Sequence, residues 1–500
     1  MQGKKELVPK MLYTVSLQEL VPKDNFYRRL NQNLDLHFLR AATAQYYGGE
    51  GQESIDPIVF FKILIVGYLN NINSDRRLIE HCADSLGIRL FLAYDIDEDL
   101  PWHSTISRTR QLYGEEVFLS LFQKVLSQCV AKGMVRGKRQ AIDSAFIKAN
   151  ASMDSLLEKE VATDAADYAR ELNEQSEYHV SSPQQIAQPE LRLPKPTDEH
   201  GDLIRGSHLS NQTHYSATDP DARISIKPGK VRRLNYFGQI AVDDAHHVIT
   251  GAMADHASKR DSDCLPDILG QTIANLAGND IQTDQITADT GYSSGSALRY
   301  CEQNNIDAYI PNLGQYKSER EGFIYNLEKD QYECQRGNKA ILIFKRIQEG
   351  KDNTRRVYRS SQKVCKDCPL RESCCGKSIK NKEINHSVDK EFYDRMHAKL
   401  SKGNTAREMS RIRSRTVEPV LGTLINYRSM SRVNTKGLAL ANKHVLMAAL
   451  SYNLKKLLDF TCKRVKTIAK ALSVPVSQGL GLRISASLNL ITADYSCLIF

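Results

Sequence analysis

A short acidic segment at residues 287–294 constrains the fold of this chain more than any other stretch. A short, partly β-branched segment precedes it, apolar side chains at helical spacing follow it at 295–304, and an apolar segment closes it at 306–310. This order predicts a βαβ unit whose first strand ends at Asp289. Ligands of open α/β sheets gather at the carboxyl ends of strands, so Asp289 is a candidate site residue. An Asp that opens a turn is nevertheless more often a turn former, and further acids are needed to support a site.

The segments around this unit predict a mixed sheet. Residues 138–148 alternate with a period of two and carry Asp143 near their middle, which predicts a strand. Residues 234–253 predict a β-hairpin, and residues 265–276 predict a helix with Pro266 in its first turn. Asp243 lies in the hairpin turn, where we expect it to form the turn rather than to act in catalysis.

The N-terminal part predicts a run of short helices. Asp56 can cap a buried helix at 58–69, and Ser74 can cap a second helix that ends at Gly87. A third helix follows residue 102, with Arg110 expected outward and Leu112 inward.

Arginines stand near the starts of two of these helices. Arg76 and Arg77 open the second helix, and Arg108 and Arg110 lie on the third. This arrangement resembles a helix-turn-helix module that binds DNA. An ordinary helical domain with solvated arginines fits the same pattern.

Two segments interrupt the α/β pattern. Residues 154–228 are polar, and we expect them to be helical at 155–175 and loop-like beyond. Residues 315–404 carry four cysteines whose spacing suits a structural Zn²⁺ site, although reduced free thiols fit the pattern equally and Cys375 adds a fifth thiol. The candidate ligands are Cys334, Cys365, Cys368 and Cys374.

A third acid lies far downstream, at Glu418. Apolar residues between 417 and 425 recur at helical spacing, and Pro419 places Glu418 on the first turn of that helix. Basic residues flank this acid and are candidates for contacts with phosphate; they are Arg413, Arg415 and Arg428.

These three carboxylates, on a strand, at a second strand end and on a late helix, match the layout of an RNase H-like two-metal site. Mg²⁺ takes oxygen ligands and usually only one or two carboxylates. A pair of ions about 3.5–4 Å apart needs a bridging acid and one more acid for each ion. We therefore expect Asp143 to bridge two Mg²⁺ ions and Asp289 and Glu418 to hold one each, with Mn²⁺ able to substitute.

The same acids lie in longer motifs that resemble those of bacterial insertion-sequence DDE transposases. The motifs occur in order at residues 142–152, 288–292 and 417–422, and residues 101–108 and the cysteine cluster resemble further parts of that family. The resemblance implies an α/β fold with an RNase H-like mixed sheet flanked by helices, an all-α N-terminal domain and two insertions. It implies metal-dependent cleavage and strand transfer at transposon ends, with Asp143, Asp289 and Glu418 as the catalytic acids.

The implied partner is double-stranded DNA, both the terminal inverted repeats and the target. Because a pair of ends must be held together, we expect a homodimer on DNA. Related enzymes often carry an Arg four residues before the Glu and a Lys seven after it, where this chain has Ser414 and Ile425. Two alternatives therefore stay open: an RNase H-like nuclease that cuts without joining, and a catalytically inactive DNA-binding relic.

The composition limits which partners and which cellular compartment fit this protein. The net charge of +9 fits a polyanionic partner. The longest apolar run is too short to cross a bilayer, and eleven cysteines without a secretion signal favour a reducing compartment. We expect a cytoplasmic, nucleoid-associated bacterial protein.

Five hundred residues exceed one ordinary domain. The expected divisions are a helical DNA-binding domain at 1–130, the first part of the core at 131–153 and 229–314, a polar insertion at 154–228, a cysteine-containing insertion at 315–404, the Glu helix and the last core helix at 405–460, and a tail at 461–500.

Overall fold

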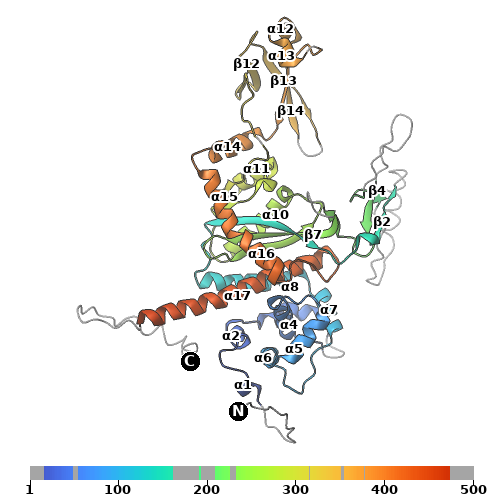
Figure 1. Cartoon of the computed structure of the whole chain (residues 1–500), viewed down its shortest axis with the longest axis vertical. Coiled ribbons are helices and arrows are strands. Elements are labelled where there is room, and N and C mark those ends of the chain that lie inside the picture. The colour runs from blue at the N-terminus through green and yellow to red at the C-terminus, as the bar shows by residue number, and fades with distance from the viewer. Residues whose placement is uncertain are drawn as a thin grey trace, which may run out of the picture.

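The computed structural model describes residues 16–48, 54–161, 191–192, 209–225, 232–314, 316–350, 354–376 and 378–472. It contains an N-terminal group of helices, a central mixed sheet with helices on its faces, and a second sheet at the far end of the molecule (Figure 1). None of the described helices combines the length and apolar character needed to cross a membrane.

The N-terminal helices follow from local capping signals. Asp56 accepts a hydrogen bond from Ile58 N at 2.7 Å and Pro57 occupies the first position of α4, as predicted. The helices are α1 (Leu17–Leu20), α2 (Phe26–Asn33), α3 (Phe38–Thr43), α4 (Pro57–Leu69), α5 (Asp75–Asp84), α6 (Leu86–Leu92), α7 (His103–Leu112) and α8 (Glu115–Ala131), with a 3₁₀ turn η1 (Ala44–Tyr46).

The predicted end of the second helix at Gly87 is wrong. Helix α5 ends at Asp84, and Ser85 caps α6 by accepting a hydrogen bond from Ile88 N at 3.4 Å. Gly87 lies inside α6, and a Cβ there would come within 2.8 Å of the Asn25 side chain. The glycine therefore permits close packing and does not terminate a helix.

The central sheet has the strand order β10–β9–β1–β7, and both β6 and β8 also pair with β7. Strand β1 pairs antiparallel with β7 and parallel with β9, and β9 pairs parallel with β10. This confirms the predicted strand, hairpin and βαβ unit. The strands are β1 (Arg139–Lys148), β6 (Arg223–Ser225), β7 (Arg233–Asp243), β8 (Ile249–His256), β9 (Gln285–Thr287) and β10 (Asp307–Tyr309).

Two expectations about the flanking segments need correction. Residues 156–161 form short strands instead of a helix, and the remainder of the expected helix, residues 162–175, lies outside the described residues. Residues 223–225, placed in the insertion by sequence, form β6 of the central sheet. The small elements here are η2 (Met153–Ser155), β2 (Leu156–Glu158) paired with β5 (His214–Ser216), and β3 (Glu160–Val161) paired with β4 (Leu191–Arg192).

One group of helices packs on the sheet with its own apolar core. Helix α10 (Asp261–Ala277), α11 (Gly295–Gln303) and α14 (Lys390–Leu400) share this core with Ile142 of β1 and Ile286 of β9. Helix α10 begins four residues earlier than predicted, so Pro266 lies beyond its first turn.

A larger core joins the sheet to the N-terminal helices through the last helix. Helix α17 (Leu438–Leu472) runs between them (Figure 1) and contacts α8, α4 and β8. Its buried side chains, such as Val445 and Leu450, belong to one apolar cluster with Phe60 of α4 and Ile240 of β7. The predicted last helix therefore extends to Leu472, into the region expected to be a tail.

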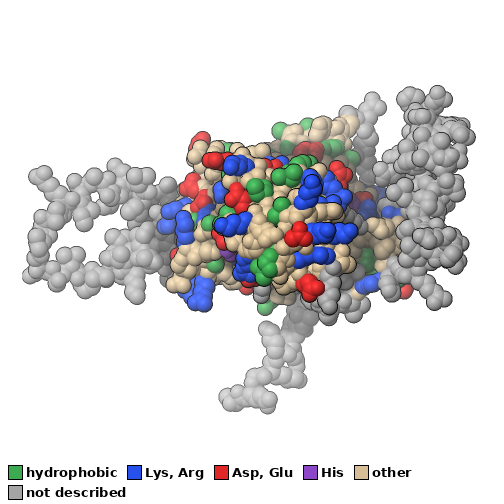
Figure 2. Space-filling model, turned by 90° about the horizontal axis from the view of Figure 1, so that it is seen from above, with side chains coloured by type: hydrophobic (Ala, Val, Ile, Leu, Met, Phe, Trp, Pro, Cys, Tyr) green, Lys and Arg blue, Asp and Glu red, His purple; other side chains and the backbone are tan. Residues whose placement is uncertain are grey.

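The cysteine-containing segment forms a five-stranded antiparallel sheet with two short helices, and it projects from the core (Figure 1). Viewed onto that end, Lys, Arg, Asp and Glu side chains alternate with exposed apolar ones (Figure 2). The elements are β11 (Phe323–Asn326), β12 (Gln331–Cys334), β13 (Ile341–Gln348), β14 (Arg355–Ser360), β15 (Glu383–Ser387), α12 (Gln362–Lys366) and α13 (Arg371–Cys375). Helices α14, α15 (Thr405–Thr416) and α16 (Glu418–Tyr427) lead back to the core.

The packing of α17 predicts a pH-dependent stability. His444 is buried, with Nδ1 2.7 Å from Tyr68 Oη and Nε2 2.9 Å from Ser429 O, and burial lowers its pKa to about 4. Because the folded-state pKa lies below the unfolded value, this stabilisation is complete above about pH 6.5 and is lost as the pH falls towards 4. Urea unfolding of His444→Gln should lose about 2–3 kcal/mol less than the unaltered protein between pH 7 and pH 4.5. The exposed His37→Gln variant is the control and should follow the unaltered protein; equal losses in all three proteins would contradict the assignment.

Candidate active site

The pairing of β1 with β9 brings two of the predicted acids side by side. The last pair of the parallel register is Ala141 with Thr287. Asp143 lies two residues after Ala141, and Asp289 lies two residues after Thr287. Strand β9 ends at Thr287, two residues before the predicted end, and Asp289 accepts a hydrogen bond from Gly291 N at 2.9 Å, which opens the 3₁₀ turn η3 (Thr290–Tyr292). The predicted turn at Asp289 is present.

Arg413 on α15 connects Asp143 to the third acid. Its two terminal nitrogens donate to Asp143 Oδ2 at 2.7 Å and to Glu418 Oε1 at 3.0 Å. Glu418 lies at the first position of α16, next to Pro419, as predicted. Ser414 Oγ also donates to Glu418 Oε1, at 2.8 Å. The arginine beside the Glu is therefore present one residue earlier than the usual position, and Ser414 holds the carboxylate itself.

The carboxylates crowd one another. Burial raises the pKa of Asp143 to about 6; the hydrogen bond from Ser144 N and the charge of Arg413 oppose this rise, and the charges of Asp289 and Asp261 add to it. Negative charge is therefore concentrated near the strand ends, and a cation would be stabilised there.

Asp261, at the first position of α10, is a fourth acid that sequence reasoning missed. Ser144 Oγ donates to Asp261 Oδ1 at 2.5 Å, and burial raises the pKa of Asp261, with Asp289 adding to the rise. The helix was expected to start at 265, which left Asp261 in an unassigned connection. A better reading of the acidic first turn, Asp261 and Asp263, would have found it.

Asp243 forms a turn, as predicted. Its carboxylate accepts hydrogen bonds from Gly137 N at 2.8 Å, Ala245 N at 3.0 Å and Gln140 Nε2 at 3.0 Å. These donors lie in its own turn and beside it on the neighbouring strand. The carboxylate of Asp243 is therefore bound within the turn and does not contribute to the group of acids.

The predicted DNA-binding arginines fall into two groups. Arg76, Arg77, Arg108 and Arg415 are exposed. Arg110 is buried, and both of its terminal nitrogens donate to Asp75, at 2.9 and 2.6 Å. Arg428 is also buried, and it donates to Leu69 O at 3.1 Å.

The expected outward direction of Arg110 and inward direction of Leu112 are therefore wrong. Ile106, Thr109 and Arg110 form the buried face of α7, and Leu112 is 49% exposed. An arginine can lie inside because Asp75 pairs with both ends of its guanidinium. Arg110 and Arg428 have structural roles in place of the predicted contacts with DNA.

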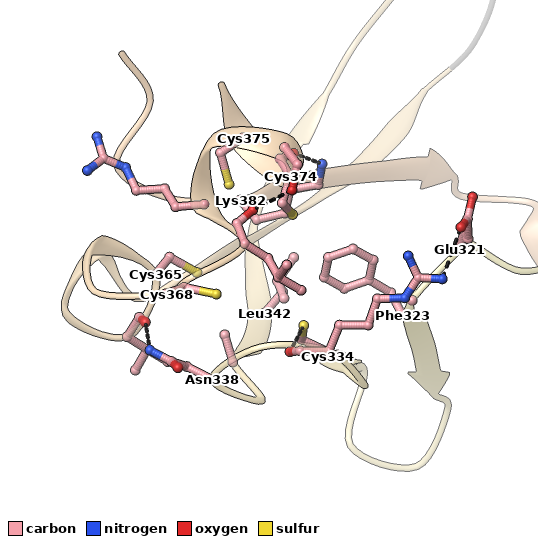
Figure 3. A pocket seen from close by; sticks show the side chains of 17 residues that line it. Glu321, Phe323, Cys334, Asn338, Leu342, Cys365, Cys368, Cys374, Cys375 and Lys382 are labelled. Atoms are coloured by element: carbon pink, nitrogen blue, oxygen red, sulfur yellow. Dashed lines mark hydrogen bonds and ion pairs between the residues drawn. The ribbon is translucent and has the colours of Figure 1, made fainter. Parts of the chain in front are cut away.

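The four predicted zinc ligands line a single cavity of about 380 Å³ in the far sheet (Figure 3). Cys365 and Cys368 lie next to each other at the end of α12, Cys334 faces them from the end of β12, and Cys374 and Cys375 come from α13 (Figure 3). Cys334 Sγ donates to Arg336 O at 2.8 Å, and Cys365 Sγ donates to Ser360 Oγ at 3.0 Å. Throughout the described parts of the chain, no three His, Cys, Asp or Glu side chains are grouped closely enough to hold a metal ion.

Comparisons with known proteins identify two transposase domains in the chain. The family model of a transposase domain, DUF772, matches residues 15–112, and that of a transposase DDE domain matches residues 333–458. Both families consist of transposase domains, so the class of this protein is a transposase. The matches support the resemblance of its motifs to those of insertion-sequence DDE transposases. The second match spans the cysteine cluster and Glu418.

No curated protein matches the chain in sequence. Among solved structures, it is similar to a cryo-EM structure of the piggyBac transposase synaptic complex with hairpin DNA. The TM-score is 0.30 and the identity is 11%, over 90% of this chain and 80% of that one.

The bridge made by Arg413 gives a stability prediction. Replacing Arg413 with Gln should lower the free energy of unfolding by about 1.5–3 kcal/mol, because two charge-assisted hydrogen bonds are lost and neighbouring carboxylates keep their charges. Arg415→Gln, an exposed change on the same helix, is the matched control and should stay within about 0.5 kcal/mol of the unaltered protein. Chemical unfolding at pH 7.5 in EDTA measures both; equal effects of the two changes would refute a supporting role for Arg413.

Proposed function

We propose that this transposase cuts and joins DNA at the ends of an insertion sequence, using divalent cations held by Asp143, Asp289 and Glu418. The observation that carries the proposal is the convergence of three acids that lie far apart in the sequence. Asp143 and Asp289 are neighbours in the β1–β9 register, and Arg413 joins Asp143 to Glu418. Packing alone gives no reason to gather like charges at one place.

The topology supports an RNase H-like assignment of the core. A central strand that carries Asp143 has an antiparallel hairpin on one side and the parallel strands of a βαβ unit on the other. Asp289 follows the end of the adjacent parallel strand by two residues, and Glu418 begins a late helix that contacts β1. This is the arrangement expected for a two-metal site of that fold.

The donor set fits Mg²⁺ or Mn²⁺. All candidate ligands are carboxylate oxygens, and the pKa of Asp143 is raised by burial, to which the charges of Asp289 and Asp261 add despite the opposing charge of Arg413. A closed protein cage is not required, because Mg²⁺ usually keeps water and substrate phosphate among its ligands. Bound ions would activate water or a 3′-hydroxyl and stabilise the leaving oxygen of the displacement. The chain itself contributes the placement of the acids: β1 and β9 set two of them, and Arg413 and Ser414 orient Glu418.

A basic helix face supports DNA as the substrate. Arg407, Arg411 and Arg415 recur every four residues on α15, and all three are exposed. Their side chains form no ion pair with any other described residue. They lie on the helix that carries Arg413 but on a different face from it, so they would contact phosphate groups of the DNA to one side of the acids. Arg76, Arg77 and Arg108 offer a second exposed basic surface, consistent with the helix-turn-helix proposal.

Two features favour an active enzyme over a relic. Arg413 contacts Asp143 and Glu418 directly, so it can serve in place of the arginine expected at Ser414. The three acids are also present: Asp289 lies near enough to Asp143 for its charge to raise the pKa of Asp143, and Arg413 joins Asp143 to Glu418. Arg428 is buried and does not replace the lysine expected at Ile425. A dimer that holds two DNA ends and a nucleoid location follow from this activity and are part of the proposal.

The activity is tested with Asp143→Asn on a duplex carrying the sequences that flank the coding region. Cleavage in Mg²⁺ should fall by about 10³-fold or more, because removing one member of a catalytic group that acts as a unit removes most of its effect. Asp267→Asn, an exposed change of the same type, is the control and should cut normally. Cleavage that survives Asp143→Asn would end the assignment, and an unaltered protein that binds the duplex without cutting would favour the relic.

The joining step separates a transposase from a simple nuclease. A pre-cut end with a free 3′-hydroxyl should be joined to target DNA by the unaltered protein and not by Asp143→Asn. Cleavage without joining would favour the nuclease.

We also propose that the thiols of the far sheet bind a structural Zn²⁺. The support is that four thiols line one cavity: Cys334 of β12, Cys365 of α12, Cys374 of α13, and Cys368 from the connection between the two helices. Gly337, with φ +57°, lies so close to Cys368 that a Cβ would be 2.4 Å from its sulfur, so the loop after Cys334 is shaped around that thiol.

Metal analysis of the purified protein tests the zinc site. One zinc per chain should be found, and Cys368→Ser should lose it and lower the melting temperature of the far sheet because a metal cross-link is lost. Cys375→Ser, which changes the neighbouring thiol outside the proposed set, should keep the zinc. A zinc-free unaltered protein purified without chelators would show that these are free thiols.

A further inference from the structure

The side chain of Asp261 lies on the opposite side of β1 from the Arg413 bridge. Successive residues of a strand point to opposite faces, so Asp143 reaches Arg413 on α15 while Ser144 reaches Asp261 on α10. Asp289 lies at the end of the adjacent strand, beside both. The acids therefore form two halves, one with an arginine and one without.

Asp261 and Asp289 lie close together over Gly291. A Cβ at Gly291 would be 2.8 Å from Asp261 Oδ2 and 3.0 Å from Asp289 Oδ1. Because both oxygens lie near that one point, they are less than about 6 Å apart, within the span of two ligands that share a divalent cation through direct or water-mediated contacts. The absence of a side chain at Gly291 leaves the space between them open.

No Lys or Arg side chain of the described residues pairs with Asp261 or Asp289. The other two acids do have such a partner, because Asp143 and Glu418 share Arg413. The side chains that contact Asp261 are neutral: Ser144 donates its hydroxyl to Asp261, and Gln239 and Tyr292 lie close enough to lower the pKa of this acid. Two carboxylates at this spacing repel each other unless a cation lies between them.

The neighbouring polar groups supply a second, independent observation. Gln239 is fully buried opposite Ser144 on β7, and its Oε1 accepts the Tyr292 hydroxyl at 2.5 Å. Its Nε2 is buried and makes no hydrogen bond of ordinary geometry with any described residue, although it lies close enough to Asp261 to lower the pKa of that acid. A buried amide donor in this position is satisfied if Asp261 is held as a carboxylate or if a ligand with an acceptor oxygen enters the site.

We propose that Asp261 is a fourth carboxylate of the divalent-cation site, which binds a cation together with Asp289, with Ser144 and Gln239 orienting it. The inference rests on the proposed function, because it assumes that the site binds divalent cations. It adds to the three acids of the motifs a ligand that no motif contains. The alternative is that Asp261 only stabilises the positive end of α10, as an acid in a first turn does.

Mn²⁺ binding to the full-length protein without DNA separates these roles. Titration calorimetry with Mn²⁺ and melting curves with and without Mn²⁺ are measured for the unaltered protein, Asp261→Asn, Asp143→Asn and Asp267→Asn. The last variant removes an exposed charge from the same helix, where Asp267 is 55% exposed, and should bind Mn²⁺ as the unaltered protein does. Asp261→Asn should bind Mn²⁺ about tenfold more weakly or worse and lose most of the Mn²⁺-induced rise in melting temperature.

The melting temperature in EDTA, where no divalent cation is bound, distinguishes a ligand role of Asp261 from a purely structural one. If Asp261 is a ligand, Asp261→Asn should melt at the same or a higher temperature in EDTA, because one repelling charge is gone. If it only stabilises α10, the melting temperature in EDTA should fall and Mn²⁺ affinity should be unchanged, which would overturn the inference.

The Asp143→Asn variant distinguishes the two proposals. Normal Mn²⁺ affinity in Asp261→Asn together with weakened affinity in Asp143→Asn refutes the role of Asp261 and leaves the proposed function standing. No Mn²⁺ binding by the unaltered protein refutes both. Ser144→Ala retains every carboxylate, and an intermediate loss of Mn²⁺ affinity in that variant is expected if the hydroxyl orients Asp261.

Discussion

Helix α17 is the element on which the rest of the arrangement depends, because it fills the space between the N-terminal helices and the sheet. An apolar helix could fill that space without fixing how the two parts are oriented. Here the buried polar residues of α17 fix it. Asn453 donates to Ile249 O at 2.8 Å and accepts from Ile249 N at 2.9 Å, while Lys443 donates to Arg110 O at 3.1 Å. A shift of either part would leave these buried groups unpaired, which is costly.

The same constraint reaches the acids through the segment between α16 and α17. Val433 N donates to Lys148 O at 3.0 Å and Lys148 N donates to Ser431 O at 3.1 Å, so this segment extends the end of β1. Arg428, at the end of α16, donates to Leu69 O of α4. Helix α16 is thus fixed at its far end to the strand that carries Asp143 and to the N-terminal helices. The position of Glu418 at its other end follows from that attachment and from Arg413.

Much of this arrangement could be predicted from the sequence, because local periodicity and capping determine where strands and helices form. The alternation around Asp143, the strand end at Asp289 and the proline after Glu418 each gave the correct element. Properties that depend on packing between distant segments could not be predicted. Arg110 lies inside because Asp75 is there to pair with it, and the glycine at position 87 leaves room for the Asn25 side chain and does not end a helix. Asp261 was missed because the apolar periodicity of α10 begins after its polar first turn, so the pattern placed the helix start too late.

The distribution of positive charge among the acids has a consequence for how cations can enter. Arg413 lies between Asp143 and Glu418, so a cation that takes both carboxylates must displace the guanidinium or share its oxygens. The space between Asp261 and Asp289 contains no such competitor among the described residues, and Gly291 keeps it free of a side chain. A cation between Asp261 and Asp289 would therefore relieve their repulsion without displacing a positive side chain. On the α15 side, Arg413 already compensates the charges of Asp143 and Glu418. If Arg413 turned instead toward a phosphate of bound DNA, Asp143 and Glu418 would lose that compensation together. Substrate binding would then make the second half of the site attractive to a cation when the backbone to be cut is in place.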